Sequence, residues 1–120
     1  MKYLAMALIG ILMLEGAHKI SSIEQTGTWV YLYDDSGKKY KSLSASTVGN
    51  VLGFSSTFFV SRDGSWIYLW DSDGKKYKTI SASTIGDVIS VSGETFTSRN
   101  GPWIYTWDRN GNKINTRAAR

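Results

Sequence analysis

The chain has 120 residues, enough for one domain with a core of modest size. It contains no cysteine, which excludes disulfides, thiolate metal sites and a lipid anchor attached through cysteine. Fourteen basic and ten acidic residues give a formal net charge of +4, a mild excess that favours acidic partners but gives no strong signal for nucleic-acid binding.

The first segment, residues 1–19, is hydrophobic. Met1-Lys2 precedes the apolar run Tyr3–Leu14, which is the pattern of a secretory signal. The run is shorter than the roughly 20 residues that a transmembrane helix needs. We therefore expect a signal-like leader or an anchor. A signal would export the protein to the periplasm, the cell surface or the medium, and any membrane contact is expected through this segment alone.

Two observations keep other interpretations of this segment open. Glu15 would stand third before a cut after Ala17, where a signal peptidase requires a small residue. An uncleaved segment would be a helix packed on the sheets or a strand. The strand follows from the repeat period described next, because this period places Ile11–Lys19 and Ser21–Gln25 at the first two strand positions of a repeat.

Residues 20–120 are predicted to form a β-repeat domain. Its repeats start at Trp29, Trp66 and Trp103, so that neighbouring copies are 37 residues apart. Between the first two copies, roughly 20 of the 37 positions are identical. A period of this length indicates a repeat architecture.

Each repeat is expected to hold four short antiparallel strands. In Trp66–Asp71, aromatic and aliphatic residues alternate with the period of two that is typical of a strand. The turn Ser72-Asp73-Gly74 follows, and glycine tolerates the positive φ of a tight hairpin. The other predicted strands of this unit are Lys75–Ile80, Gly86–Ser92 and Thr95–Arg99, and Ser81–Thr84 is predicted to connect two of them.

The pattern Trp-x-Tyr-x-Trp-Asp-x-x-Gly-Lys at 66–75 resembles the hairpin of a quinoprotein-type β-propeller blade. The turns at 61–64 and 98–101 resemble a shortened Asp-box, the hairpin turn of some sialidases and other propellers. The resemblance implies an all-β fold of four-stranded, antiparallel, blade-like repeats. The cofactor residues of the quinoprotein family are absent, so we expect no quinone and no other cofactor.

A ring of blades is not complete within this chain. It holds two full blades, Val48–Ile80 and Ile85–Thr116, and most of a third, whereas known rings hold about four to eight. The outermost blades are therefore expected to expose apolar faces that a partner must cover. We expect a homo-oligomer, most simply a dimer that pools its blades into one ring. An open twisted array and a sandwich are the alternatives.

Aromatic side chains are the first candidates for ligand binding. Trp70 and Trp107 stand at the strand end near the turn, and Tyr33 is their equivalent in the first copy. If they are partly exposed, these three can stack on sugar rings. The favoured interpretation of the aromatic ladder is nevertheless packing in the core between sheets, because large aromatic side chains drive burial.

Basic side chains are the second candidates. Repetition would gather the lysines into a belt that attracts anions, and Arg62 and Arg99 could clamp an anion beside it. The favoured interpretation is that lysines on outer strands discourage aggregation between sheets. The lysines of the belt are Lys38, Lys75, Lys76 and Lys78.

Catalytic and metal-binding residues are missing from the sequence pattern. His18 is the sole histidine, so no Ser/His/Asp or Cys/His set can form. The Asp-rich turns Asp34–Gly37, Asp71–Gly74 and Asp108–Gly111 resemble the start of a calcium loop but lack its later ligands. We therefore expect no enzyme and no metal site. The leading hypothesis is a non-enzymatic β-repeat binding module that acts as a homo-oligomer, with a glycan read by exposed aromatic residues as its candidate ligand. The alternatives are a binder of nucleotides, nucleic acid or acidic polysaccharide, and a purely structural part of a surface or virion assembly.

Overall fold

A computed structural model describes residues 18–119, so the expectations for the apolar run before them lie outside the described residues. The described chain is all-β apart from two short helices. Its elements are β1 (Ser22–Gln25), β2 (Trp29–Tyr33), β3 (Lys39–Ser44), α2 (Ala45–Val48), β4 (Asn50–Phe54), β5 (Phe58–Asp63), β6 (Trp66–Asp71), β7 (Lys76–Ser81), α3 (Ala82–Ile85), β8 (Asp87–Ser92), β9 (Thr95–Asn100), β10 (Trp103–Asp108) and β11 (Lys113–Ala118).

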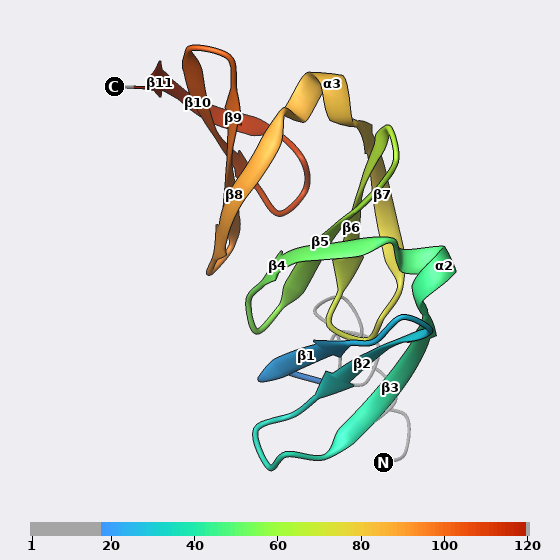
Figure 1. Ribbon diagram of the computed structural model, residues 1–120. Helices are drawn as coiled ribbons and strands as arrows, with labels where there is room; N and C mark the ends of the chain where they lie inside the picture. Colours follow the sequence, from blue (N-terminus) through green and yellow to red (C-terminus); the bar gives the residue numbers. More distant parts are fainter. Residues whose placement is uncertain (1–17, 120) are drawn as a thin grey trace, which may run out of the picture.

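The strands form three antiparallel sheets, which follow one another along the chain. The first sheet has the order β1-β2-β3, the second β4-β5-β6-β7 and the third β11-β10-β9-β8. Figure 1 shows the sheets stacked one on the next, with α2 and α3 as the connections. The predicted all-β fold of blade-like repeats is confirmed, and β1 lies where the repeat period places a second strand. The predicted connection after β7 contains the helix α3.

The second sheet is apolar on both faces because it is buried between the other two. Along β6, Ile67 and Leu69 pack toward the third sheet, whereas Tyr68 and Trp70 pack toward the first. This is the alternation that a pleated strand imposes on successive side chains. The second sheet thus turns tyrosine and tryptophan of β6 toward the first sheet and isoleucine and leucine of β6 toward the third.

A buried hydrogen-bond relay recurs in the second and third sheets. The Trp70 indole Nε1 donates to Ser61 Oγ at 2.9 Å, and Ser61 Oγ donates to the carbonyl oxygen of Val48 at 2.7 Å. In the third sheet, Trp107, Ser98 and Ile85 repeat the relay at 2.9 and 2.6 Å. The relay satisfies polar groups that have lost water and ties the end of each helix to the sheet that follows it.

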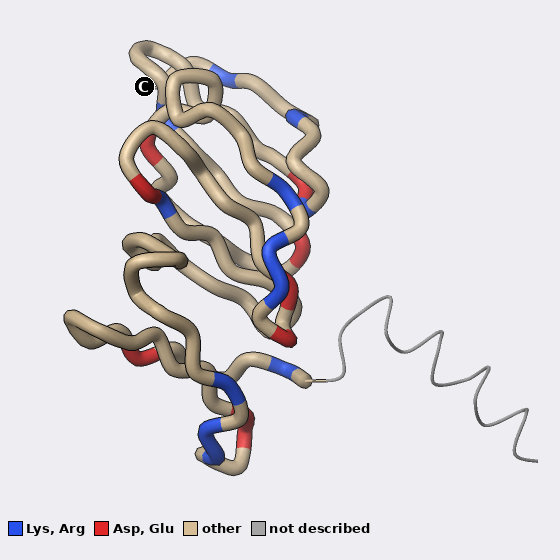
Figure 2. The backbone as a smooth tube through the Cα atoms, turned by 90° about the vertical axis from the view of Figure 1, so that its right-hand side faces the viewer, with Lys and Arg blue, Asp and Glu red and all other residues tan. Residues whose placement is uncertain are grey.

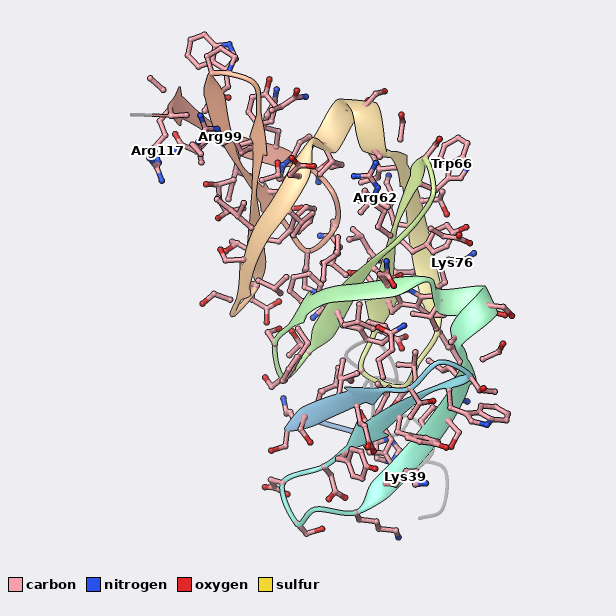
Figure 3. All side chains as sticks on the ribbon, viewed as in Figure 1. Lys39, Arg62, Trp66, Lys76, Arg99 and Arg117 are labelled. Atoms are coloured by element: carbon pink, nitrogen blue, oxygen red, sulfur yellow. The ribbon has the colours of Figure 1, made fainter. Side chains whose placement is uncertain are left out.

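The third sheet presents a polar outward face. Its register matches that of the second sheet, so equivalent positions can be compared directly. Ile104 is kept at 7% exposure on this face, between its cross-strand partners Arg99 and Arg117, whose aliphatic stems can cover apolar surface. Both arginines lie on the outer side of the third sheet (Figure 3). The polar replacements are Thr95 for Phe58, Thr97 for Val60, Thr106 for Leu69 and Arg117 for Ile80.

The first sheet is altered in the same sense on its opposite, aromatic face. The pair of Tyr33 and Glu24 takes the place of an indole and a serine, and the Tyr33 hydroxyl donates to Glu24 Oε1 at 2.8 Å. This hydrogen bond raises the pKa of Tyr33. Ser22, the cross-strand partner of Tyr33, stands where the second sheet has Phe59. A tyrosine, a carboxylate and a serine suit a face in contact with water.

The outward faces bear on one premise of the predicted assembly. We expected the outermost sheets to expose apolar faces that a partner covers. Over residues 18–119, threonines stand on the outward face of the third sheet, but Ile89 and Ile114 of that sheet are each 56% exposed. Polar outer faces on the end repeats are the usual way in which a repeat array is capped. The homo-oligomer itself stays a prediction, to be decided by the mass of the protein in solution.

At each junction between sheets, a tyrosine hydroxyl of one sheet donates a hydrogen bond to a turn of the next. We call this contact the tyrosine latch. The Tyr40 hydroxyl, on the first sheet, donates to the carbonyl oxygen of Ser72 in the β6–β7 turn at 2.6 Å. The Tyr77 hydroxyl donates in the same way to the carbonyl oxygen of Arg109 in the β10–β11 turn. The third sheet has Ile114 at this position, which cannot make the latch. The tyrosine latch is thus confined to the two junctions between sheets.

Replacing Tyr40 is expected to change stability at alkaline pH. Burial raises the pKa of Tyr40 to about 12, whereas an unfolded tyrosine loses its proton near 10. The contribution of this group to the free energy of unfolding is therefore complete below pH 10 and is lost as pH rises toward 12. Tyr40→Phe should reduce the loss of stability between pH 8 and 11, measured by urea unfolding. The pKa of Tyr77, raised by burial, and that of Tyr33, raised by its hydrogen bond to Glu24, contribute to the remaining slope. An unchanged slope in Tyr40→Phe would contradict this assignment.

Candidate functional site

Three exposed indoles lie at equivalent positions on the three sheets. Trp29, Trp66 and Trp103 are 43%, 49% and 46% exposed. Each is the first residue of a central strand, directly after the turn that precedes it. Figure 3 shows Trp66 pointing outward from the end of its hairpin. We call these three residues the tryptophan row.

The tryptophan row is not required by the core. In β6, the buried aliphatic residues begin with Ile67, one position after Trp66. An indole is among the largest apolar side chains, and leaving half of it in water in every repeat forgoes burial energy. An exposed indole offers a flat apolar face on which a ligand ring can stack. The tryptophan row is therefore the leading candidate site.

Trp70 and Trp107, the candidates for partial exposure, are buried, so the interpretation of the aromatic ladder as core is confirmed for them. They are only 3% and 4% exposed, because each indole stacks on a phenylalanine and belongs to a buried relay. The ring centroids of Trp70 and Phe59 are 5.5 Å apart, and those of Trp107 and Phe96 are 6.0 Å apart. Tyr33, the third predicted residue, is half-buried and bonded to Glu24. Neither Trp70 nor Trp107 presents a free indole face to a ligand.

Two equivalent pockets lie beside the tryptophan row, one at each junction between sheets. We call them the interblade pockets. Their volumes are about 350 Å³ at the first junction and about 370 Å³ at the second. Each is lined by the turn at the end of a sheet, a short helix and the beginning of the next sheet. The first is lined by Gln25, Thr26, Gly27, Ala45, Ser46, Gly49 and Asn50, and the second by Arg62, Ser65, Ser81, Ala82, Ser83, Gly86 and Asp87.

The two arginines that were predicted to bind an anion lie in different surroundings. Arg62 points into the space beside α3 and β8 (Figure 3), where its Nη1 lies 3.7 Å from Asp87 Oδ1 and its Nε donates to the carbonyl oxygen of Gly64 at 2.9 Å. Arg99 makes the equivalent bond to the carbonyl oxygen of Gly101 at 3.2 Å, but it lies on the outward face of the third sheet. Only Arg62 therefore lines a pocket.

The predicted lysine belt is interrupted by acidic residues. Figure 2 shows acidic and basic positions interspersed along the same edge of the stack. Lys76 Nζ lies 3.9 Å from the centre of the Tyr68 ring, and this cation–π contact recurs in the other two sheets. Lys38, Lys75 and Lys78 are exposed. The surface is one of mixed charge, which attracts anions less than a continuous basic belt would.

The Asp-rich turns are explained by their own hydrogen bonds. In the β10–β11 turn, Asp108 Oδ1 accepts from the backbone N–H groups of Asn110 and Asn112 at 2.9 and 3.0 Å. The bond from Asn112 is the main reason that the pKa of Asp108 is lowered. Within residues 18–119, no three His, Cys, Asp or Glu side chains are grouped as metal ligands. In that same range, no helix is long and apolar enough to cross a membrane.

In the second and third copies, sequence reasoning chose the wrong tryptophan of the strand as the candidate for exposure. The signal that distinguishes them is present in the first copy. There the strand keeps its leading indole, Trp29, while the second indole is replaced by Tyr33 on a face that has no preceding sheet among the described residues. Comparison with known proteins gives no match, either to a family model or to a curated protein.

Proposed function

We propose that this protein is a non-enzymatic binding module whose tryptophan row stacks on the sugar rings of a glycan. One observation carries the proposal: three indoles, each about half exposed, recur at the same position of three stacked sheets. The flat face of an indole packs well against the apolar face of a sugar ring, while its edge remains in contact with water. The serines and threonines nearby supply hydrogen bonds of the kind that hydroxyl groups accept and donate.

The arrangement favours an extended ligand. The tryptophan row offers one equivalent contact on each of three successive sheets. A glycan chain that touches more than one indole gains affinity from effective concentration, even when each contact is weak.

A binder of anionic ligands is the second candidate, and salt separates it from the first. Binding through lysines and arginines weakens steeply as salt rises, whereas stacking on sugars is expected to survive moderate salt. Because the edge that carries the lysines has mixed charge, it favours the glycan proposal over the anion-binding one. A variant in which Lys38, Lys75, Lys76 and Lys78 are all replaced by alanine should keep its ligand if the glycan proposal is correct.

Removing the tryptophan row is expected to abolish binding. Each single Trp→Ala change should weaken the affinity about tenfold, since one stacking contact contributes roughly 1–2 kcal/mol. The triple variant Trp29→Ala, Trp66→Ala, Trp103→Ala should lose detectable binding to the glycans that the wild-type protein retains on an array. Isothermal titration with those glycans measures the change.

The matched control for this experiment is an exposed apolar residue without an aromatic face. Ile89 and Ile114 are each 56% exposed. Ile89→Ala and Ile114→Ala should leave the affinity within about twofold, because they remove apolar surface without removing a stacking platform. Full affinity in the triple tryptophan variant would overturn the proposed function.

A further inference from the structure

We propose that the two interblade pockets are subsites that bind the hydroxyl groups of a neutral oligosaccharide lying along the tryptophan row. This inference rests on the proposed function and adds to it the kind of sugar and the side chains that select it. It starts from the recurrence of one pocket at both junctions, with the same parts of the repeat on its walls.

The pockets and the tryptophan row lie at the same end of the sheets. Ser65, which lines the second pocket, directly precedes Trp66, and consecutive Cα atoms are about 3.8 Å apart. Ser81, another lining residue, is the cross-strand partner of Trp66. At the first junction, Thr26 and Gly27 of the lining lie shortly before Trp29. A ligand stacked on these indoles therefore lies beside the pockets.

The order of these features along the stack is indole, pocket, indole, pocket, indole. Trp29 belongs to the first sheet, Trp66 to the second and Trp103 to the third. Each pocket joins the turn of one sheet to the beginning of the next. This alternation of apolar platforms and polar recesses matches an oligosaccharide, whose rings have apolar faces and hydroxyl-bearing edges.

The second pocket carries a donor and an acceptor on opposite walls. The Arg62 guanidinium offers N–H donors only, and the Asp87 carboxylate offers acceptors only. Their 3.7 Å pair is solvent-exposed, with the Asp87 side chain 85% exposed, so the pair itself is weak and open to a ligand. A sugar hydroxyl both donates and accepts, and neighbouring hydroxyls can satisfy the two groups together.

The charges of the second pocket balance, which selects against acidic sugars. An anionic group that approached Arg62 would also meet the carboxylate of Asp87, and like charges repel. The first pocket is neutral, because Gln25 and Asn50 replace these two residues. The Gln25 amide is fixed there, since its Nε2 donates to the carbonyl oxygen of Gly49 at 2.7 Å and its Oε1 accepts from the Val51 N–H at 3.0 Å. Both pockets thus favour uncharged, hydroxyl-rich ligands.

Arg62→Gln tests the inference, and Arg99→Gln is its matched control. The two arginines make equivalent bonds to their own turns, but only Arg62 lines a pocket. The probes are two ladders of increasing length, one of neutral oligosaccharides of glucose, galactose and N-acetylglucosamine and one of uronic-acid oligosaccharides. Arg62→Gln should weaken binding of the neutral ladder about tenfold, the effect of losing one charge-assisted hydrogen bond, whereas Arg99→Gln should stay within about twofold.

Asp87→Asn provides a second variant that is safe for the fold, because its exposed side chain contributes little to stability. It should weaken binding of the neutral ladder and narrow the preference for neutral over acidic sugars. Equal affinities for Arg62→Gln and Arg99→Gln, or tighter binding of the uronic-acid ladder by the wild-type protein, would overturn the inference. If the triple tryptophan variant loses binding while Arg62→Gln keeps it, the proposed function stands and the subsites fail. If neither ladder binds, the proposed function fails as well.

Discussion

Gly86→Ala is expected to lower the free energy of unfolding by about 3–4 kcal/mol, the sum of backbone strain and a steric clash. Gly86 ends α3 with φ 85° and ψ −154°, a region that only glycine adopts readily. A Cβ built there would lie 2.4 Å from the carbonyl oxygen of Arg99 in β9. The backbone of β9 cannot move aside without breaking its pairing with β8. Chemical denaturation of the variant measures the loss.

Gly93→Ala is the control for a positive φ without a steric clash. Gly93 also has a positive φ, 59°, but a Cβ at this position meets nothing within 4 Å. Its cost should be about 1 kcal/mol, that of placing an alanine in the left-handed region alone. A similar small cost at Gly86 would show that the close packing of α3 on β9 is not as described.

Leu69→Thr is expected to destabilise the protein by about 3 kcal/mol, from lost burial and an unpaired buried hydroxyl. Leu69 is fully buried between the second and third sheets. The threonine of the variant is the residue that the chain itself carries at the equivalent position, Thr106, on the outward face of the third sheet. Thermal and urea unfolding measure the effect.

The reverse substitution, Thr106→Leu, tests the same assignment of buried and outward faces. Thr106→Leu adds apolar surface where no further sheet follows among the described residues, so it should change stability by less than about 0.5 kcal/mol. It should increase self-association at high concentration, which sedimentation detects. A large loss of stability in Thr106→Leu, together with a small one in Leu69→Thr, would contradict the assignment of the buried and outward faces.

The architecture was predictable from sequence because its signals are local. The strands of each repeat join through tight turns such as Asp71–Gly74, and alternation within Trp66–Asp71 fixes which side chains share a face. The polar outward face of the third sheet was also encoded, in Thr95, Thr97 and Thr106. It becomes meaningful only when the register shows that these positions replace buried apolar residues of the second sheet.

The candidate site was less predictable because it depends on packing between sheets. Sequence alone places an indole at each end of β6, and only the stacking of Trp70 on Phe59 shows which of the two is covered. The interblade pockets combine residues from a turn, a helix and the next sheet, such as Arg62 and Asp87. Such combinations have no sequence motif, since they arise from the angle at which neighbouring sheets meet.

The most direct test of glycan binding by the tryptophan row is the set of indole N–H signals in a nitrogen–proton correlation spectrum. The chain has five tryptophans and hence five such signals, which single substitutions assign. Addition of a bound glycan should shift the signals of Trp29, Trp66 and Trp103 and leave those of the buried Trp70 and Trp107 nearly in place. Shifts confined to the two buried indoles, or no shift of the three exposed ones under saturating glycan, would contradict the proposal.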